Sequence, residues 1–293
     1  MPYRVPCPRH ELFARPPYPF PFFQGRPFVS VLTSTGCSGK CIFCSHRLAP
    51  LGRRDTDDVR RELFRINELG IRCVYFQDAC FTMDRGAVLA TLDQIQELPD
   101  PIRWVCSCRV DQVDRELLEK MKATGCIAIQ FGVESGNEAI LKLLNKNITL
   151  QQALGTFQLC RELGIRTHAF FIMGLPMETT ETMQQTVEFA LKLNPDSASF
   201  GVPMFLAGTT LTNKYGGEAF LREGDDVSPA RQPRTGILES DLMQALRAAY
   251  RRFYFRPAYA LRQLGRARNP RDFWVAIRQG VGLLRWIGGG RRS

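Results

Sequence analysis

The strongest constraint on the fold is a regular alternation of strand-like and helix-like segments, repeated six times between residues 28 and 202. Short apolar runs rich in β-branched and aromatic residues predict strands at 28–33, 72–77, 102–107, 126–131, 166–173 and 197–202. Longer stretches with polar first residues predict helices at 55–69, 84–98, 114–123, 137–144, 149–163 and 179–193. Because strands that alternate with helices form parallel sheets with right-handed crossovers, the sequence predicts an α/β fold.

Six units are too few to close an eight-stranded barrel. Parallel α/β folds place their active sites beyond the carboxyl ends of the strands, so the residues after each strand are the candidates for function.

The segment after the first strand contains three cysteines within eight residues, Cys37, Cys41 and Cys44. A structural zinc site takes four protein ligands, whereas three cysteines on a four-iron cluster leave one iron open to an outside ligand. His46 follows two residues after Cys44, so a Cys3His zinc site is the alternative interpretation.

The Cys-x3-Cys-x2-Cys spacing, with Phe43 before the third cysteine, resembles the cluster loop of the radical S-adenosylmethionine (radical SAM) enzymes. The resemblance implies a partial (β/α)6 TIM-like barrel, with a [4Fe–4S] cluster held by Cys37, Cys41 and Cys44. In that family the open iron chelates SAM, and reductive cleavage of SAM gives a 5′-deoxyadenosyl radical. Phe43 would then lie beside the cofactor.

The resemblance also implies that residues at the strand ends contact SAM. These candidates are Asp78, Arg109, Glu134, Ser135, Gly174 and Pro176. Four of these have a structural alternative: Glu134 as a helix cap, Arg109 in an ion pair, and Gly174 with Pro176 in an ordinary turn.

His168 and Arg166 share a side-chain face of the predicted fifth strand, so both are candidates for contact with substrate. A histidine in an apolar strand is also often a core residue with satisfied hydrogen bonds. We expect the other seven cysteines, including Cys106 and Cys108, to pack in the core, since free cysteine behaves as a small hydrophobe.

Composition divides the chain into three parts. Residues 1–27 hold eight of the 18 prolines and predict an extended strap, residues 28–205 form the barrel core, and residues 206–293 form a mainly helical extension. From Arg247 onward there are 12 arginines and one acid, a net charge of +11, against −1 for the preceding residues. Such a tail can bind anionic lipid, nucleic acid or an acidic protein, or simply remain solvated. The segment 272–287 suits either a cover for the barrel or a peripheral membrane contact.

Three further segments narrow the resemblance to the cobalamin-binding class of radical SAM proteins: 21–28, 131–136 and 250–259. That class carries a Rossmann-like cobalamin domain before the barrel, but only 36 residues precede Cys37, and no Asp-x-His-x-x-Gly segment occurs. We therefore expect cobalamin, if the reaction uses it, to come from a separate cobalamin-binding protein.

The resemblance implies a radical SAM enzyme that abstracts hydrogen from a small-molecule biosynthetic intermediate, such as a lipid, a tetrapyrrole or another natural product, and we expect it to be cytoplasmic. The outcome on substrate would be methylation, rearrangement or cyclisation, with flavodoxin or ferredoxin as reductant. An RNA-modifying enzyme and a zinc-binding scaffold are the alternatives, although no added RNA-binding domain is visible. No apolar run is long enough for a transmembrane helix, and the ten cysteines suit a reducing compartment.

Overall fold

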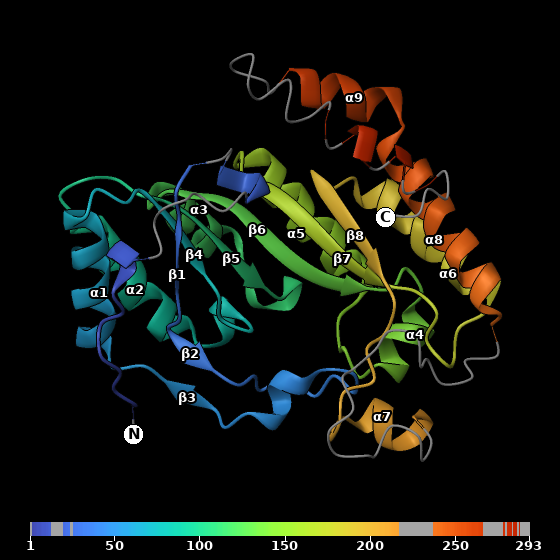
Figure 1. Ribbon diagram of the computed structural model, residues 1–293, viewed down its shortest axis with the longest axis horizontal. Coiled ribbons are helices and arrows are strands. Elements are labelled where there is room, and N and C mark those ends of the chain that lie inside the picture. The colour runs from blue at the N-terminus through green and yellow to red at the C-terminus, as the bar shows by residue number, and fades with distance from the viewer. Residues whose placement is uncertain are drawn as a thin grey trace.

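A six-stranded parallel sheet forms the centre of the protein (Figure 1). The computed structural model describes residues 2–12, 20–23, 26–216, 237–265 and isolated positions between 278 and 287. The strand order is β1-β4-β5-β6-β7-β8, so each strand pairs with its neighbours in the chain apart from the short β2 and β3. The bounds are β1 Val29–Val31, β4 Cys73–Phe76, β5 Arg103–Cys108, β6 Cys126–Glu134, β7 Arg166–Ile172 and β8 Ser197–Gly201.

Helices cover the outer face of this sheet. Alternate strand residues, among them Phe76, Trp104 and Phe131, are fully buried there against the helices. Most helices begin at a side chain that accepts a backbone N–H, as Asp55 and Thr149 do. The bounds are α1 Thr56–Glu68, α2 Arg85–Gln96, α3 Arg115–Ala123, α4 Glu138–Leu143, α5 Leu150–Glu162 and α6 Thr180–Leu193.

The predicted α/β class and partial (β/α)6 barrel are confirmed: six parallel strands lie in sequential order, and β1 and β8 remain as the two edges. The sequence reading missed the small antiparallel pair of β2, Ser34–Thr35, with β3, Gly52–Arg53. Two-residue strands are too short to leave a periodic pattern.

The edge strand β8 is covered by the C-terminal helix α8, Glu239–Tyr254. The Tyr254 hydroxyl donates to the carbonyl of Ala198 at 2.6 Å and accepts from its N–H at 3.0 Å. Tyr250 accepts from the N–H of Phe200. Helix α8 therefore satisfies the backbone of an edge strand and belongs to the barrel. In Figure 1, α9, Pro257–Leu264, lies at the opposite end of the molecule from α7, Thr210–Tyr215.

The described parts of the N-terminal strap, residues 2–12, 20–23 and 26–27, are less extended than the prolines predict, because they contain two single-turn 3-10 helices, His10–Leu12 and Pro21–Phe23. His10 is buried, with its Nε2 2.6 Å from Glu62 of α1. Phe20 stacks on Tyr75 at 5.0 Å, and Phe22 and Phe23 are buried beneath the inner face of the sheet. The strap therefore closes the amino end of the barrel with aromatic rings.

Most of the predicted amphipathic segment 272–287, together with residues 217–236, lies outside the described residues. Within the part of the chain that is described, no helix has the length and apolar character needed to cross a membrane.

Candidate active site

The loop that holds Cys37, Cys41 and Cys44 leaves the carboxyl end of β1 and lies where the strand ends converge. Its backbone is fixed from two sides. The N–H of Ile42 donates to the carbonyl of Leu144 at the end of α4, and the Ile42 carbonyl accepts from Leu211 in α7. The Asn145 side chain donates to the carbonyl of Lys40. These bonds fix the position of the loop relative to α4 and α7.

Two of the three thiols, those of Cys37 and Cys41, lie close to Gly39. A Cβ at this glycine would lie 3.3 Å from the Cys37 sulfur and 4.0 Å from the Cys41 sulfur, so the missing side chain leaves room between the two thiols. The Gly39 N–H points at the Cys37 sulfur, 3.3 Å away. Burial raises the pKa of Cys44, the N–H of His46 opposes this rise, and the thiols of Cys41 and Cys37 add to it.

Arg109 brings positive charge to this loop from the end of β5. Its Nη1 lies 3.7 Å from the Cys41 sulfur, while Nη2 donates to the carbonyl of Lys146 at 2.6 Å. Two hydrogen bonds to Asp111, at 2.9 and 2.8 Å, orient the guanidinium. Arg109 therefore forms the ion pair that was the alternative to a cofactor contact. This ion pair also orients the Arg109 guanidinium toward Cys41.

Lys146 completes the charged group, although the sequence reading did not select it. Its ammonium lies 2.8 Å from the Glu134 carboxylate, and both side chains are buried. Burial alone would lower the pKa of Lys146, but Glu134 and, to a smaller degree, Cys41 raise it on balance. A side chain at Gly132 would collide with both charged groups, so this glycine makes space for the pair.

Comparison with known proteins identifies the family to which this arrangement of residues belongs. The model of the radical SAM superfamily matches residues 31–190, which include the three-thiol loop and the strand ends beside it. The chain belongs to the radical SAM superfamily. Its members use a [4Fe–4S] cluster and SAM, so the family favours the four-iron interpretation of the loop over the zinc alternative.

This radical SAM chain is similar in sequence to two curated relatives. It is 30% identical over 270 residues to an uncharacterized methyltransferase of Pyrococcus horikoshii, with 89% of this chain and 58% of that one covered. It is 28% identical over 238 residues to the anaerobic magnesium-protoporphyrin IX monomethyl ester cyclase of Cereibacter sphaeroides, with 76% and 38% covered. It thus matches little more than half of the length of one relative and less than half of the other.

The structural match supports the fold. The radical SAM methyltransferase TsrM from Kitasatospora setae, solved with cobalamin and a [4Fe–4S] cluster, superposes with a TM-score of 0.59 at 23% identity. The superposition covers 64% of this chain and 36% of TsrM. A partial barrel of the radical SAM type is therefore the observed fold.

The residues present at the strand ends fit the two cofactors of the superfamily. The three thiols of one short loop, with Cys44 close enough to Cys41 and Cys37 to feel their charge, suit the three protein ligands of a four-iron cluster. No three His, Cys, Asp or Glu side chains among the described residues are arranged to hold a single metal ion, and His46 is exposed. Two buried carboxylate oxygens, Asp78 Oδ2 and Glu178 Oε1, have no hydrogen-bond partner within the described chain. Free acceptors of this kind suit the amino and hydroxyl donors of SAM.

Asp78 also holds the start of the cluster loop. Its Oδ1 accepts from the N–H and hydroxyl of Thr33 at 3.1 and 2.8 Å, and from the Ser34 hydroxyl at 2.6 Å. Burial raises the pKa of Asp78, and these donors oppose the rise. Only Oδ2 thus remains for the predicted contact with SAM.

The turn after β7 is built by Glu178, which the sequence reading also missed. Its Oε2 accepts the N–H groups of Gly174 and Leu175 at 2.8 and 2.9 Å. Gly174 has a φ of +85°, and a Cβ there would press on Leu242 of α8. Burial raises the pKa of Glu178 to about 7, and the two N–H donors oppose that rise. Pro176 is partly exposed in this turn, where it remains a candidate for the adenine pocket.

The two remaining cofactor candidates differ in their surroundings. Phe43 packs against the apolar cluster that includes Leu175 and Phe205, so it anchors the loop. Ser135 has no exposed surface, and its hydroxyl contacts Thr186 at 3.2 Å and accepts from the N–H of Asn137. The Ser135 hydroxyl therefore links the start of α4 to α6, and its contact with SAM stays a prediction.

Of the two substrate candidates, Arg166 donates to the carbonyl of Phe22 at 2.6 Å and covers its ring at 5.2 Å. This contact with the strap argues against a role for Arg166 in binding substrate. His168 stands on the partly exposed inner face of β7, with Nδ1 2.8 Å from Ser197 and Nε2 3.1 Å from Ser199.

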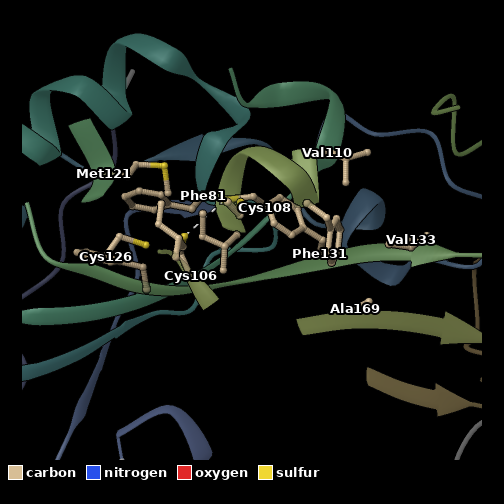
Figure 2. Close-up of a cluster of buried hydrophobic side chains, with 14 of the residues drawn as sticks. Phe81, Cys106, Cys108, Val110, Met121, Cys126, Phe131, Val133 and Ala169 are labelled. Carbon is tan, nitrogen blue, oxygen red and sulfur yellow. Dashed lines mark hydrogen bonds between the residues drawn. The ribbon is translucent and has the colours of Figure 1, made fainter. Parts of the chain in front are cut away.

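Six of the other seven cysteines are buried as predicted. Figure 2 shows Cys106, Cys108 and Cys126 among Phe81, Met121 and Phe131, on the helix-covered side of the sheet. The Cys106 and Cys108 sulfurs lie 3.5 Å apart, and burial raises the pKa of Cys106. Such thiols are inert core groups. Cys7 departs from the prediction, because it is exposed in the strap.

Proposed function

We propose that this chain is the catalytic barrel of an enzyme that uses a radical SAM mechanism to abstract hydrogen from an unactivated carbon of a small molecule. The observation that carries the proposal is the three-thiol loop at the carboxyl end of β1, inside the region matched by the superfamily model. The methyltransferase and cyclase relatives support methylation or cyclisation as the outcome on substrate.

Cys37, Cys41 and Cys44 would hold the cluster, and Asp78 and Glu178 would offer acceptors to SAM. When bound, the cluster and SAM supply a 5′-deoxyadenosyl radical, which is the group that takes hydrogen from substrate. The protein contributes charge and position. Arg109 places its guanidinium 3.7 Å from the Cys41 sulfur, where its positive charge would offset part of the negative charge of a bound cluster.

A reductant must reach the cluster loop, and the loop surface supports an acidic electron carrier such as flavodoxin or ferredoxin. Lys40 and Arg47 are exposed on or beside the loop. Electrostatic complementarity of this kind speeds encounter with an acidic partner. The described barrel includes no cobalamin domain, so we further propose that any cobalamin comes from another polypeptide or domain.

The test is an anaerobic reconstitution with iron and sulfide, followed by reduction with SAM and chromatographic measurement of 5′-deoxyadenosine. Wild type should produce 5′-deoxyadenosine, and Cys37→Ala, Cys41→Ala and Cys44→Ala should each abolish it. Cys7→Ala is the matched control, because Cys7 is exposed and lies outside the cluster loop, in the N-terminal strap. Full SAM cleavage by any of the three loop variants would refute the proposal.

A further inference from the structure

The inner face of the sheet carries a row of polar side chains across four neighbouring strands. Neighbouring strands pair these residues in register: Ser107 of β5 lies beside Gln130 of β6, Gln130 lies beside His168 of β7, and His168 lies beside Ser197 of β8. All four are partly exposed, although residues on the opposite face are buried in the core. A polar row inside a barrel is costly unless hydrogen bonds or a ligand satisfy it.

The row is joined internally by hydrogen bonds. The Tyr75 hydroxyl of β4 donates to Gln130 Oε1 at 3.0 Å, and the Ser107 hydroxyl lies 3.3 Å from the same oxygen. His168 contacts a serine hydroxyl at each ring nitrogen. Burial lowers the pKa of His168 to about 4, so the imidazole is neutral at pH 7. One nitrogen then donates and the other accepts, and the two serines hold the ring in place.

Hydrogen-bonding capacity remains after these contacts are formed. The amide nitrogen of Gln130 donates to no other described residue, so its two N–H groups can bind an acceptor. The serine that accepts from His168 keeps its own O–H for donation. Phe170 lies one layer closer to the cluster loop, edge-to-face with His168 at 4.5 Å, and is 38% exposed. The row thus combines neutral donors with an apolar ring.

Three charged side chains beside the row have partners among the described residues. Below it, Arg166 is bound to the carbonyl and ring of Phe22. Above it, Arg109 pairs with Asp111, and Lys146 pairs with Glu134. A carboxylate or phosphate placed on the row would lose its hydration without meeting a cation of its own, which is expensive.

We infer that this row is a substrate-binding wall for an uncharged amide or other carbonyl group of a small molecule whose apolar frame lies against Phe170. The inference rests on the proposed function, since it identifies the chemistry of the substrate for that site. It assigns Gln130 and His168 to specificity, with Ser197 and Ser199 as positioning residues for the imidazole.

The experiment measures probe binding on the full chain with its cluster in the oxidised state, by NMR of ¹⁵N-labelled histidine rings. The chain contains three histidines, and the spectrum of His168→Gln identifies the His168 signals. Benzamide, benzoate and phenyl phosphate are matched probes, because they share one ring and differ in charge. Benzamide should shift the His168 signals saturably, with a Kd at least tenfold lower than either anion. Equal or tighter binding of an anion, or no shift with any probe, would overturn the inference.

Gln130→Glu tests the assignment without changing side-chain size. It removes the N–H donors and adds a carboxylate beside His168, so benzamide binding should weaken at least tenfold and the pKa of His168 should rise. Gln184→Glu on the exposed surface of α6 is the matched control and should change neither. Wild-type behaviour of Gln130→Glu would overturn the role of Gln130. Because probe binding needs no SAM cleavage, a positive deoxyadenosine assay with negative probe binding refutes this inference alone.

Discussion

Replacing Glu178 by glutamine should remove a pH-dependent loss of stability. Burial raises the pKa of Glu178 to about 7 from its ordinary 4.5, so folding favours the protonated carboxyl. A group with a raised folded-state pKa contributes stability that is fully present below the unfolded pKa. This stability is lost as the pH rises through the folded pKa, so the loss falls between about pH 4.5 and 7.

The magnitude follows from the two pKa values. Each unit is worth about 1.4 kcal/mol, so the full shift corresponds to about 3 kcal/mol of unfolding free energy. Glutamine has the same shape, and its oxygen can accept the N–H groups of Gly174 and Leu175. Its NH2 group would occupy the position of Oε1, which has no partner among the described residues, at a cost that is the same at every pH.

The assay is chemical denaturation of wild type and Glu178→Gln at pH 5 and pH 8 without SAM. The stability of wild type relative to the variant should fall by about 2–3 kcal/mol between the two pH values. Glu181→Gln, at an exposed position in the first turn of α6, should show no such change relative to wild type. A constant difference between wild type and Glu178→Gln across this range would refute the reasoning.

Three further predictions concern the cluster loop and its surroundings. Gly39→Ala should lower iron and sulfide content several-fold, because its Cβ would lie 3.3 Å from the Cys37 sulfur, whereas Gly155→Ala in α5 meets nothing within 4 Å and should load normally; equal loading of the two variants would contradict the need for space at Gly39. Lys146→Met should cost about 3–5 kcal/mol in equilibrium unfolding by stranding Glu134, and adding Glu134→Gln should restore most of it; a double variant no better than the single would argue against the ion pair. Cys106→Ala should lower the free energy of unfolding by about 1–2 kcal/mol, because it removes core volume. The variant should retain full iron content, because it removes no ligand; iron loss would place Cys106 at the cluster.

The sequence predicted the strands well, because each carries buried residues that face the helices. It also placed the cluster loop, since the cysteine spacing is local. It could not show that Glu134 pairs with Lys146, because that contact depends on a left-handed φ of +70° at Glu134 and on a turn after α4.

Arg166 illustrates a different limit. Its strand parity correctly indicated the inner face, but parity says nothing about what else reaches that face. The Arg166 guanidinium donates a hydrogen bond to the carbonyl of Phe22, a strap residue 144 positions earlier in the chain. Glu178 left a weak signal, a carboxylate four residues after a glycine, which only the N–H bonds of the folded turn make meaningful.

The central claim is that three thiolates leave one iron open to SAM. Its most direct test is the EPR spectrum of the reduced, reconstituted protein with and without SAM. We expect a four-iron signal whose g values shift when SAM is added, because the open iron would bind SAM. A signal that SAM leaves unchanged, or a protein that takes up zinc and no four-iron cluster, would contradict it.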